Sequence, residues 1–144
     1  MSVENNNHRI ERLFALQRAT RVARKQESAD VRGAKLAKLK DAIVARIPQI
    51  EQALYEDLRK APNGGKGGEI ASVLGELATA IGQLEQWMAP KPVAQSSYLP
   101  NTAAHIQYEP RGVILLLGAW NFPFALVMAP LVAIVAAGNS AIVK

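Results

Sequence analysis

The sequence has 144 residues, of which 49% are apolar and 20% are charged, a composition typical of an ordinary globular domain. It contains no cysteine, which excludes disulfide bonds and thiolate metal sites within it. The net charge of +5 comes from residues 1–60, where thirteen Lys or Arg are interspersed with eight acids and only Phe14 and Tyr55 are aromatic, so we expect solvated helix faces and no nucleic-acid partner.

Two amphipathic helical segments are predicted before residue 60. The first spans residues 5–26 and is followed by Ser28-Ala29-Asp30, a break that offers an N-cap. The second segment has the clearest helical pattern in the chain, with apolar residues at steps of three and four. Its stripe comprises Leu36, Leu39, Ile43, Ile47, Ile50, Leu54 and Leu58. Pro48 falls inside this stripe and removes a backbone donor, so we expect a kink or a brief break there.

A glycine-rich connection precedes a third predicted helix. Residues 62–68 contain four glycines and predict a loop, but they lack the Gly-Lys-Ser or Gly-Lys-Thr end of a phosphate-binding loop. The apolar positions of the third helix are Ile70, Val73, Leu74, Leu77, Ile81, Leu84 and Met88. Trp87 is predicted to anchor the core on the same face. Residues 89–92 contain two prolines and end this helix.

Residues 93–110 have the composition of extended structure, and Pro100-Asn101 suits a turn. We therefore expect a hairpin or an extended arm here. His105 lies in this part of the chain, far from His8, and the two histidines have no ligand-like spacing. No metal site is expected.

An uncharged run extends from Gly112 to Val143 and is long enough to suggest a membrane span. Prolines and turn residues interrupt it, however, and a span needs about 20 mostly apolar residues in one helix. Short apolar segments separated by turns are typical of buried strands and a buried helix, so no transmembrane segment is expected.

The uncharged run instead predicts a βαβ unit. Residues 113–117 have the pattern of a strand that is apolar on both faces. A helix then begins at Pro123, is distorted at Pro130 and continues to about residue 137, where Gly138 ends it. Residues 141–143 begin a second buried strand, and the crossover should be right-handed.

Ligands gather at the carboxyl ends of strands in open α/β sheets, which directs attention to residues 118–122 and to Lys144. The first of these loops is not a Gly-x-Gly-x-x-Gly dinucleotide fingerprint. Asn121 is a compact amide on a tight turn, where it could stabilise a developing oxyanion or cap the following helix. The residues alone favour the cap.

Residues 109–124 resemble the aldehyde dehydrogenase segment that reads Glu-Pro-x-Gly-Val, hydrophobic strand, Gly-x-Trp-Asn-aromatic-Pro, and residues 136–144 continue the resemblance. Residues 53–60 and 87–90 are also similar to this family, in particular to its class 3-like branch. The resemblance implies an α/β fold in which N-terminal helices precede the start of a Rossmann-like parallel sheet, an incomplete aldehyde dehydrogenase fold. It further implies three segments. These are a helical N-terminal part of the cofactor-binding domain (1–92), an extended oligomerisation arm (93–111) and the first βαβ unit of the cofactor-binding domain (112–144).

The resemblance also implies an activity, the NAD(P)-dependent oxidation of an aldehyde to a carboxylic acid through a covalent thiohemiacetal and thioester. Asn121 would donate its amide to the oxyanion, which shifts the balance away from the cap. Trp120 would line the cofactor and substrate region, and Lys144 would contact the adenosine ribose hydroxyls of NAD or NADP. The family's nucleophilic cysteine, its glutamate base and its Gly-rich cofactor loop are expected beyond residue 144. Glu56, Glu76 and Glu109 have ordinary helix-face or loop explanations and are not substitutes for the base.

The expected partners are a small aldehyde substrate and a second copy of the chain in a homodimer. Residues 1–12 are polar and charged, so no secretory signal is expected and a cytoplasmic location is predicted. The alternative is a non-catalytic fragment that associates with membranes or with other proteins through its amphipathic helices and its apolar tail.

Overall fold

The computed structural model describes residues 3–62, 68–99 and 101–144, with side chains from residue 7 onward. Its elements follow the chain in this order: α1 (Val3–Ala19), α2 (Arg21–Lys25), α3 (Ala29–Val44), α4 (Ile47–Leu58), α5 (Gly68–Met88), β1 (Lys91–Val93), β2 (Ala104–Ile106), β3 (Val113–Leu116), α6 (Ala125–Ala136) and β4 (Ser140–Val143). Most of the predicted loop at 62–68, together with Pro100 of the predicted turn, lies outside the described residues.

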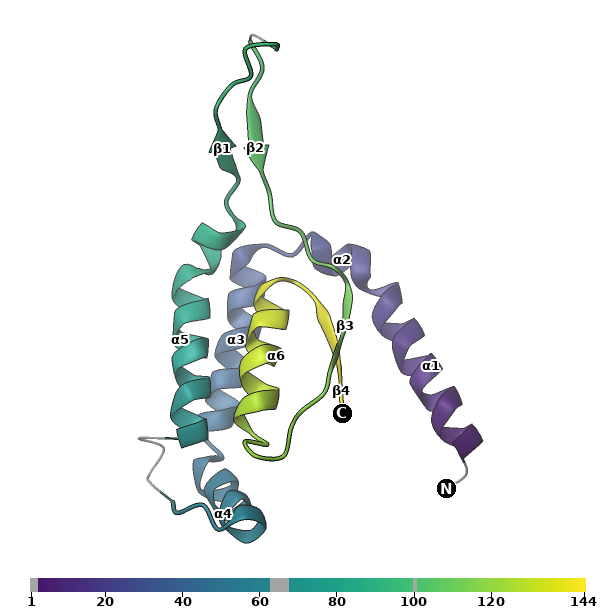
Figure 1. Cartoon of the computed structure of the whole chain (residues 1–144), viewed down its shortest axis with the longest axis vertical. Helices are drawn as coiled ribbons and strands as arrows, with labels where there is room; N and C mark the ends of the chain where they lie inside the picture. Colours follow the sequence, from purple (N-terminus) through teal and green to yellow (C-terminus); the bar gives the residue numbers. More distant parts are fainter. Residues whose placement is uncertain (1–2, 63–67, 100) are drawn as a thin grey trace.

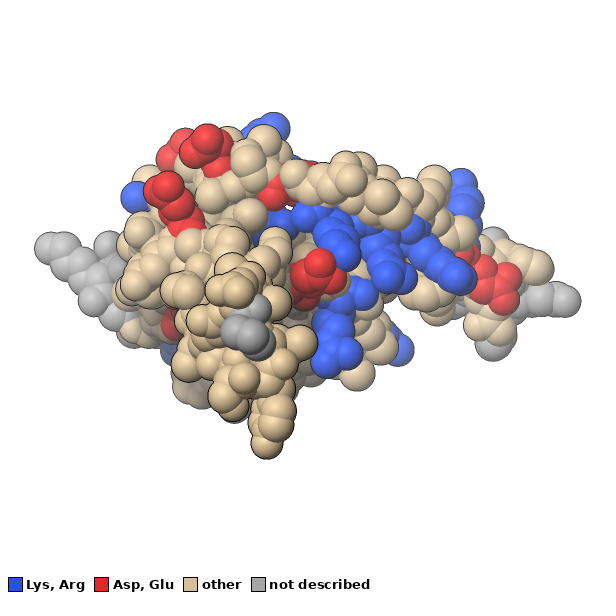
Figure 2. Space-filling model, turned by 90° about the horizontal axis from the view of Figure 1, so that it is seen from above, with Lys and Arg blue, Asp and Glu red and all other residues tan. Residues whose placement is uncertain are grey.

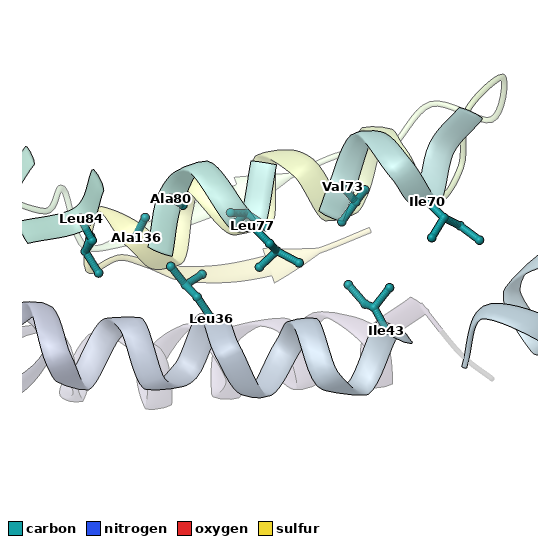
Figure 3. Close-up of a cluster of buried hydrophobic side chains, with 9 residues drawn as sticks. Leu36, Ile43, Ile70, Val73, Leu77, Ala80, Leu84 and Ala136 are labelled. Atoms are coloured by element: carbon teal, nitrogen blue, oxygen red, sulfur yellow. The ribbon is translucent and has the colours of Figure 1, made fainter. Parts of the chain in front are cut away.

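The core lies where α3, α5 and α6 pack side by side (Figure 1). Leu36 and Ile43 of α3 point toward the apolar face of α5, and Ala136 of α6 joins them (Figure 3). The buried cluster comprises Leu36, Ile43, Ile70, Val73, Leu77, Ala80, Leu84, Val132 and Ala136, each no more than 5% exposed. The periodic apolar positions predicted from the sequence for α3 and α5 therefore form the centre of the fold.

The parallel pair β3–β4 lies between α6 and α1, with contacts to both helices (Figure 1). In its register Val113 pairs with Ser140 and Leu116 pairs with Val143. This arrangement is the predicted βαβ unit, formed from the uncharged run. No helix in the described part of the chain is long and apolar enough to cross a membrane.

The predicted breaks near the N-terminus are present, with one addition. The expected first helix is divided at Thr20 into α1 and α2, whose Lys and Arg side chains form a basic band on one side of the molecule (Figure 2). Ser28 caps α3, because its Oγ accepts a hydrogen bond from the Val31 N–H at 3.4 Å. The expected break at Pro48 occurs two residues earlier, and Pro48 occupies the first turn of α4, where its missing N–H costs nothing.

The antiparallel strands β1 and β2 form a hairpin that projects away from the helices (Figure 1). All six of its strand residues are exposed, as expected for an arm. The prediction for Trp87 was wrong, because this side chain is 40% exposed. In the last turn of α5, Met88 packs against the core cluster, whereas Trp87 lines an open pocket of about 460 Å³.

Candidate functional site

The carboxyl ends of β3 and β4 bring residues 118–122 and Lys144 together. The Lys144 N–H donates to the Leu116 carbonyl, and the Gly118 N–H donates to the Lys144 carbonyl, both at 2.9 Å. These bonds extend the parallel ladder past the strands. The turn and Lys144 therefore lie side by side, as the rule for open sheets predicted.

The turn after β3 needs a glycine because it passes close over α6. A Cβ atom built at Gly118 would lie 2.3 Å from Cγ2 of Val127, which no real side chain tolerates. The glycine thus lets the backbone descend onto the helix before the chain turns into it. Trp120 and Asn121 follow on the exposed side of this turn, and Trp120 is 74% exposed.

The first turn of α6 is capped by a residue from another helix. Glu69 lies in the first turn of α5, and its Oε2 accepts hydrogen bonds from the N–H groups of Phe124 and Ala125, both at 2.9 Å. The predicted alternative for Asn121, a helix cap, is therefore performed by Glu69. Among the described residues no hydrogen bond involves the Asn121 side chain, whose amide is exposed.

Lys60 connects Glu69 to the turn. Its ammonium pairs with Oε1 of Glu69 and donates to the backbone carbonyl of Asn121 at 2.8 Å. It also lies 4.0 Å from the centroid of the Phe122 ring, a cation–π distance. Sequence reasoning missed both Lys60 and Glu69. Glu69 could have been noticed from its position, because it lies four residues before Val73 and so falls on the apolar face of α5, where a charged residue is unexpected.

A second buried charge holds the opposite end of α6. Arg32 is 5% exposed, and its guanidinium donates to the carbonyls of Ala136 (3.2 Å), Lys25 (3.4 Å) and Arg24 (3.5 Å). Burial lowers the pKa of Arg32 below its usual value, while the charge of Glu27 opposes that shift. Arg32 therefore fastens the C-terminal ends of α2 and α6 to α3. Arg32 has a structural role and does not belong to the candidate site at the carboxyl ends of β3 and β4.

The acidic residues excluded as catalytic bases have ordinary partners or surroundings. Glu56 accepts a hydrogen bond from Gln52 one turn earlier on α4, and Glu109 forms an exposed ion pair with Lys25 at 2.8 Å. Glu76 is exposed on α5. None of the three lies in the turn after β3.

Comparison with known proteins gives consistent results. The family model described as "Aldehyde dehydrogenase family" matches residues 4–144. AldX of Bacillus subtilis (strain 168) is 44% identical over 135 residues, which cover 94% of this chain and 30% of AldX. The Rattus norvegicus protein named "Aldehyde dehydrogenase, dimeric NADP-preferring" is 39% identical over 120 residues, covering 83% of this chain and 26% of that protein.

A solved structure shows the same likeness in three dimensions. Staphylococcus aureus AldH, described as a substrate-bound state, has a TM-score of 0.88 and 35% identity to this chain. The match covers 94% of this chain and 30% of AldH. The chain thus spans less than a third of the length of each of these three relatives.

Proposed function

Because this chain belongs to the aldehyde dehydrogenase family, we propose that it contributes the oxyanion donor and part of the nucleotide site to an NAD(P)-dependent dehydrogenase that oxidises an aldehyde to a carboxylic acid. The observation that carries the proposal is the junction of two strand ends. The turn that carries Asn121 follows β3, Lys144 follows β4, and the Gly118 N–H of that turn donates to the Lys144 carbonyl at the carboxyl edge of the parallel pair. Substrates and nucleotides bind at this edge in open α/β sheets.

Asn121 would act as a neutral hydrogen-bond donor. Asn121 is exposed, and its amide has no hydrogen bond among the described residues. The turn that carries it packs closely on Val127 at Gly118 and accepts a hydrogen bond from Lys60. When a thiolate attacks an aldehyde, the carbonyl oxygen gains negative charge, and a positioned amide lowers the energy of that state. The sequence has no cysteine, so the thiolate belongs to another part of the complete enzyme, as do the glutamate base and the Gly-rich loop.

Lys144 and Trp120 would hold the nucleotide. Both are exposed at the carboxyl edge, where an ammonium can donate to ribose hydroxyls and an indole offers a flat apolar surface. The donor chemistry of these two side chains therefore fits NAD or NADP, and the name of the rat relative supports NADP as one candidate. The nucleotide, when bound, supplies the hydride acceptor.

The hairpin would serve as a dimerisation arm. Tyr98 is 91% exposed and Leu99 is 61% exposed near its tip. Neighbouring apolar side chains exposed to solvent are typical of a surface that binds another protein. The rat relative is named as dimeric, which supports a homodimer here. The organisation into a helical part (1–92), an arm (93–111) and a βαβ unit (112–144) belongs to the same proposal. A cytoplasmic location stays a prediction.

The test uses a complete enzyme, built by joining residues 4–144 to the part of Bacillus subtilis AldX that lies beyond its match to this chain. In this enzyme Asn121→Ala should lower kcat by ~10² to 10³, the effect of losing one oxyanion donor. Gln83→Ala is the matched control, because Gln83 is another exposed amide but lies on α5. It should leave kcat unchanged.

Two results would contradict the proposal. Turnover of Asn121→Ala equal to that of the control would remove Asn121 from the chemistry. A folded complete enzyme that oxidises no aldehyde, tested over a series of chain lengths with NAD and with NADP, would refute the activity. The 144-residue chain alone should form no NADH or NADPH from any aldehyde, because it has no nucleophile.

A further inference from the structure

Glu69 is a buried carboxylate in an unusual place. Its side chain is 2% exposed, yet it comes from α5 and binds the first N–H groups of α6. Burying a carboxylate is costly unless hydrogen bonds and an opposite charge compensate it. Here the N–H groups of Phe124 and Ala125 supply the bonds, and Lys60 supplies the charge. A short capping residue on α6 itself would serve the helix end at lower cost.

The arrangement holds the turn that carries Asn121 on both sides. Two residues of the contact, Phe124 and Ala125, lie three and four positions after Asn121. The ammonium of Lys60 donates a hydrogen bond of 2.8 Å to the backbone carbonyl of Asn121 itself. The Lys60 side chain is partly buried, and the same ammonium is paired with Glu69. A backbone carbonyl fixed in this way sets the plane of its peptide group, and therefore limits the directions that the Asn121 side chain can take.

We propose that Glu69 and Lys60 are positioning residues that hold the Asn121 amide in its donating orientation. This inference rests on the proposed function, because it assigns to both residues an effect on the oxyanion donor. Both residues act through the backbone of the turn and neither touches the substrate. Oxyanion donors act only within a narrow range of positions, and a displacement of about 1 Å costs up to ~10²-fold in rate.

The first test is Glu69→Gln in the complete enzyme. The amide keeps the shape of the side chain, and its oxygen can take the place of Oε2 and accept from both N–H groups of α6. Its NH2 group then faces the ammonium of Lys60, so the ion pair that holds Lys60 beside the Asn121 carbonyl is lost. We expect kcat to fall by roughly 10-fold or more, while KM for aldehyde and nucleotide stays within about twofold. Glu76→Gln is the matched control, the same change on an exposed position of the same helix, and it should leave kcat unchanged.

A double-mutant cycle separates positioning from a general structural role. If Glu69 acts through Asn121, then Asn121→Ala and Asn121→Ala/Glu69→Gln should have the same kcat, because the group being positioned is already absent. A general loss of folding would instead lower kcat further in the double variant. Lys60 gives a second route if Glu69→Gln folds poorly, because its side chain is 30% exposed and tolerates change. Lys60→Met should lower kcat, and Lys60→Arg should retain most of it.

The outcomes are distinct. Wild-type kcat in Glu69→Gln or in Lys60→Met, with Asn121→Ala impaired, overturns the positioning role and leaves Asn121 as donor. A multiplicative loss in the Asn121→Ala/Glu69→Gln variant also overturns positioning through Asn121. Normal turnover of Asn121→Ala overturns the proposed donor itself, and the positioning role falls with it.

Discussion

Replacing Gly118 with alanine tests how closely the turn after β3 is held against α6. The new Cβ would lie 2.3 Å from Cγ2 of Val127 and 3.8 Å from its Cβ. Val127 is β-branched and helical, so it has one strongly preferred χ1 rotamer and cannot turn its methyl group away at low cost. Overpacking of this kind destabilises by about 1–3 kcal/mol. In a domain of this size, each kcal/mol lowers Tm by roughly 3 °C.

Thermal and urea unfolding of the 144-residue chain, followed by circular dichroism, would measure this loss. Gly75→Ala is the matched control, because no atom lies within 4 Å of a Cβ at Gly75 on α5. It should raise stability by up to about 1 kcal/mol, since alanine is the better helix former.

A second substitution identifies the contact responsible. Val127→Ala removes the clashing methyl group, so Gly118→Ala/Val127→Ala should be more stable than the sum of the single effects predicts. Stability of Gly118→Ala equal to that of Gly75→Ala, or strict additivity in the double variant, would refute the reasoning.

Three further predictions concern other contacts. Ser28→Ala should lower the free energy of unfolding by about 0.5–1 kcal/mol, because the Val31 N–H loses its cap, and an unchanged Tm would contradict this. Arg32→Met should cost about 2 kcal/mol in urea unfolding, since the Ala136 carbonyl loses a charged donor, whereas a gain in stability would show that desolvation of the guanidinium dominates. Lys144→Met in the complete enzyme should raise KM for the nucleotide by about tenfold at constant kcat, and an unchanged KM would exclude Lys144 from the nucleotide site.

The helices that build the core were predictable from their apolar periodicity alone. The stripes on α3 and α5 keep a 3.6-residue phase, and Leu36, Val73 and Leu77 on them are fully buried. Ser28 and Gly138 were predictable as helix boundaries for local reasons, a side-chain acceptor and a left-handed φ of 80°. Such features depend on neighbouring residues, which a single sequence records.

Long-range features were predicted less well. Trp87 continues the periodicity of α5, but whether a residue at a helix end is covered depends on which other elements reach it. Glu69 binds the N–H groups of Phe124 and Ala125, which lie 55 and 56 positions further along the chain, and no local sequence pattern contains such a pairing. The proximity of the turn after β3 to Lys144 was predictable, because the carboxyl ends of neighbouring parallel strands lie at the same edge of a sheet. Which side chains support that edge was not.

The place of α6 in the core sets an order of events during synthesis. During synthesis α3 and α5 are made before α6, and the Ala136 carbonyl that Arg32 binds lies 104 residues further along the chain. The apolar face that α3 and α5 share is therefore uncovered throughout the emergence of the hairpin and of β3. Long-range closure of this kind is slow compared with helix formation. The apolar core of this chain is therefore closed only by one of its last elements, and any segment that ends before α6 leaves the face of α3 and α5 uncovered.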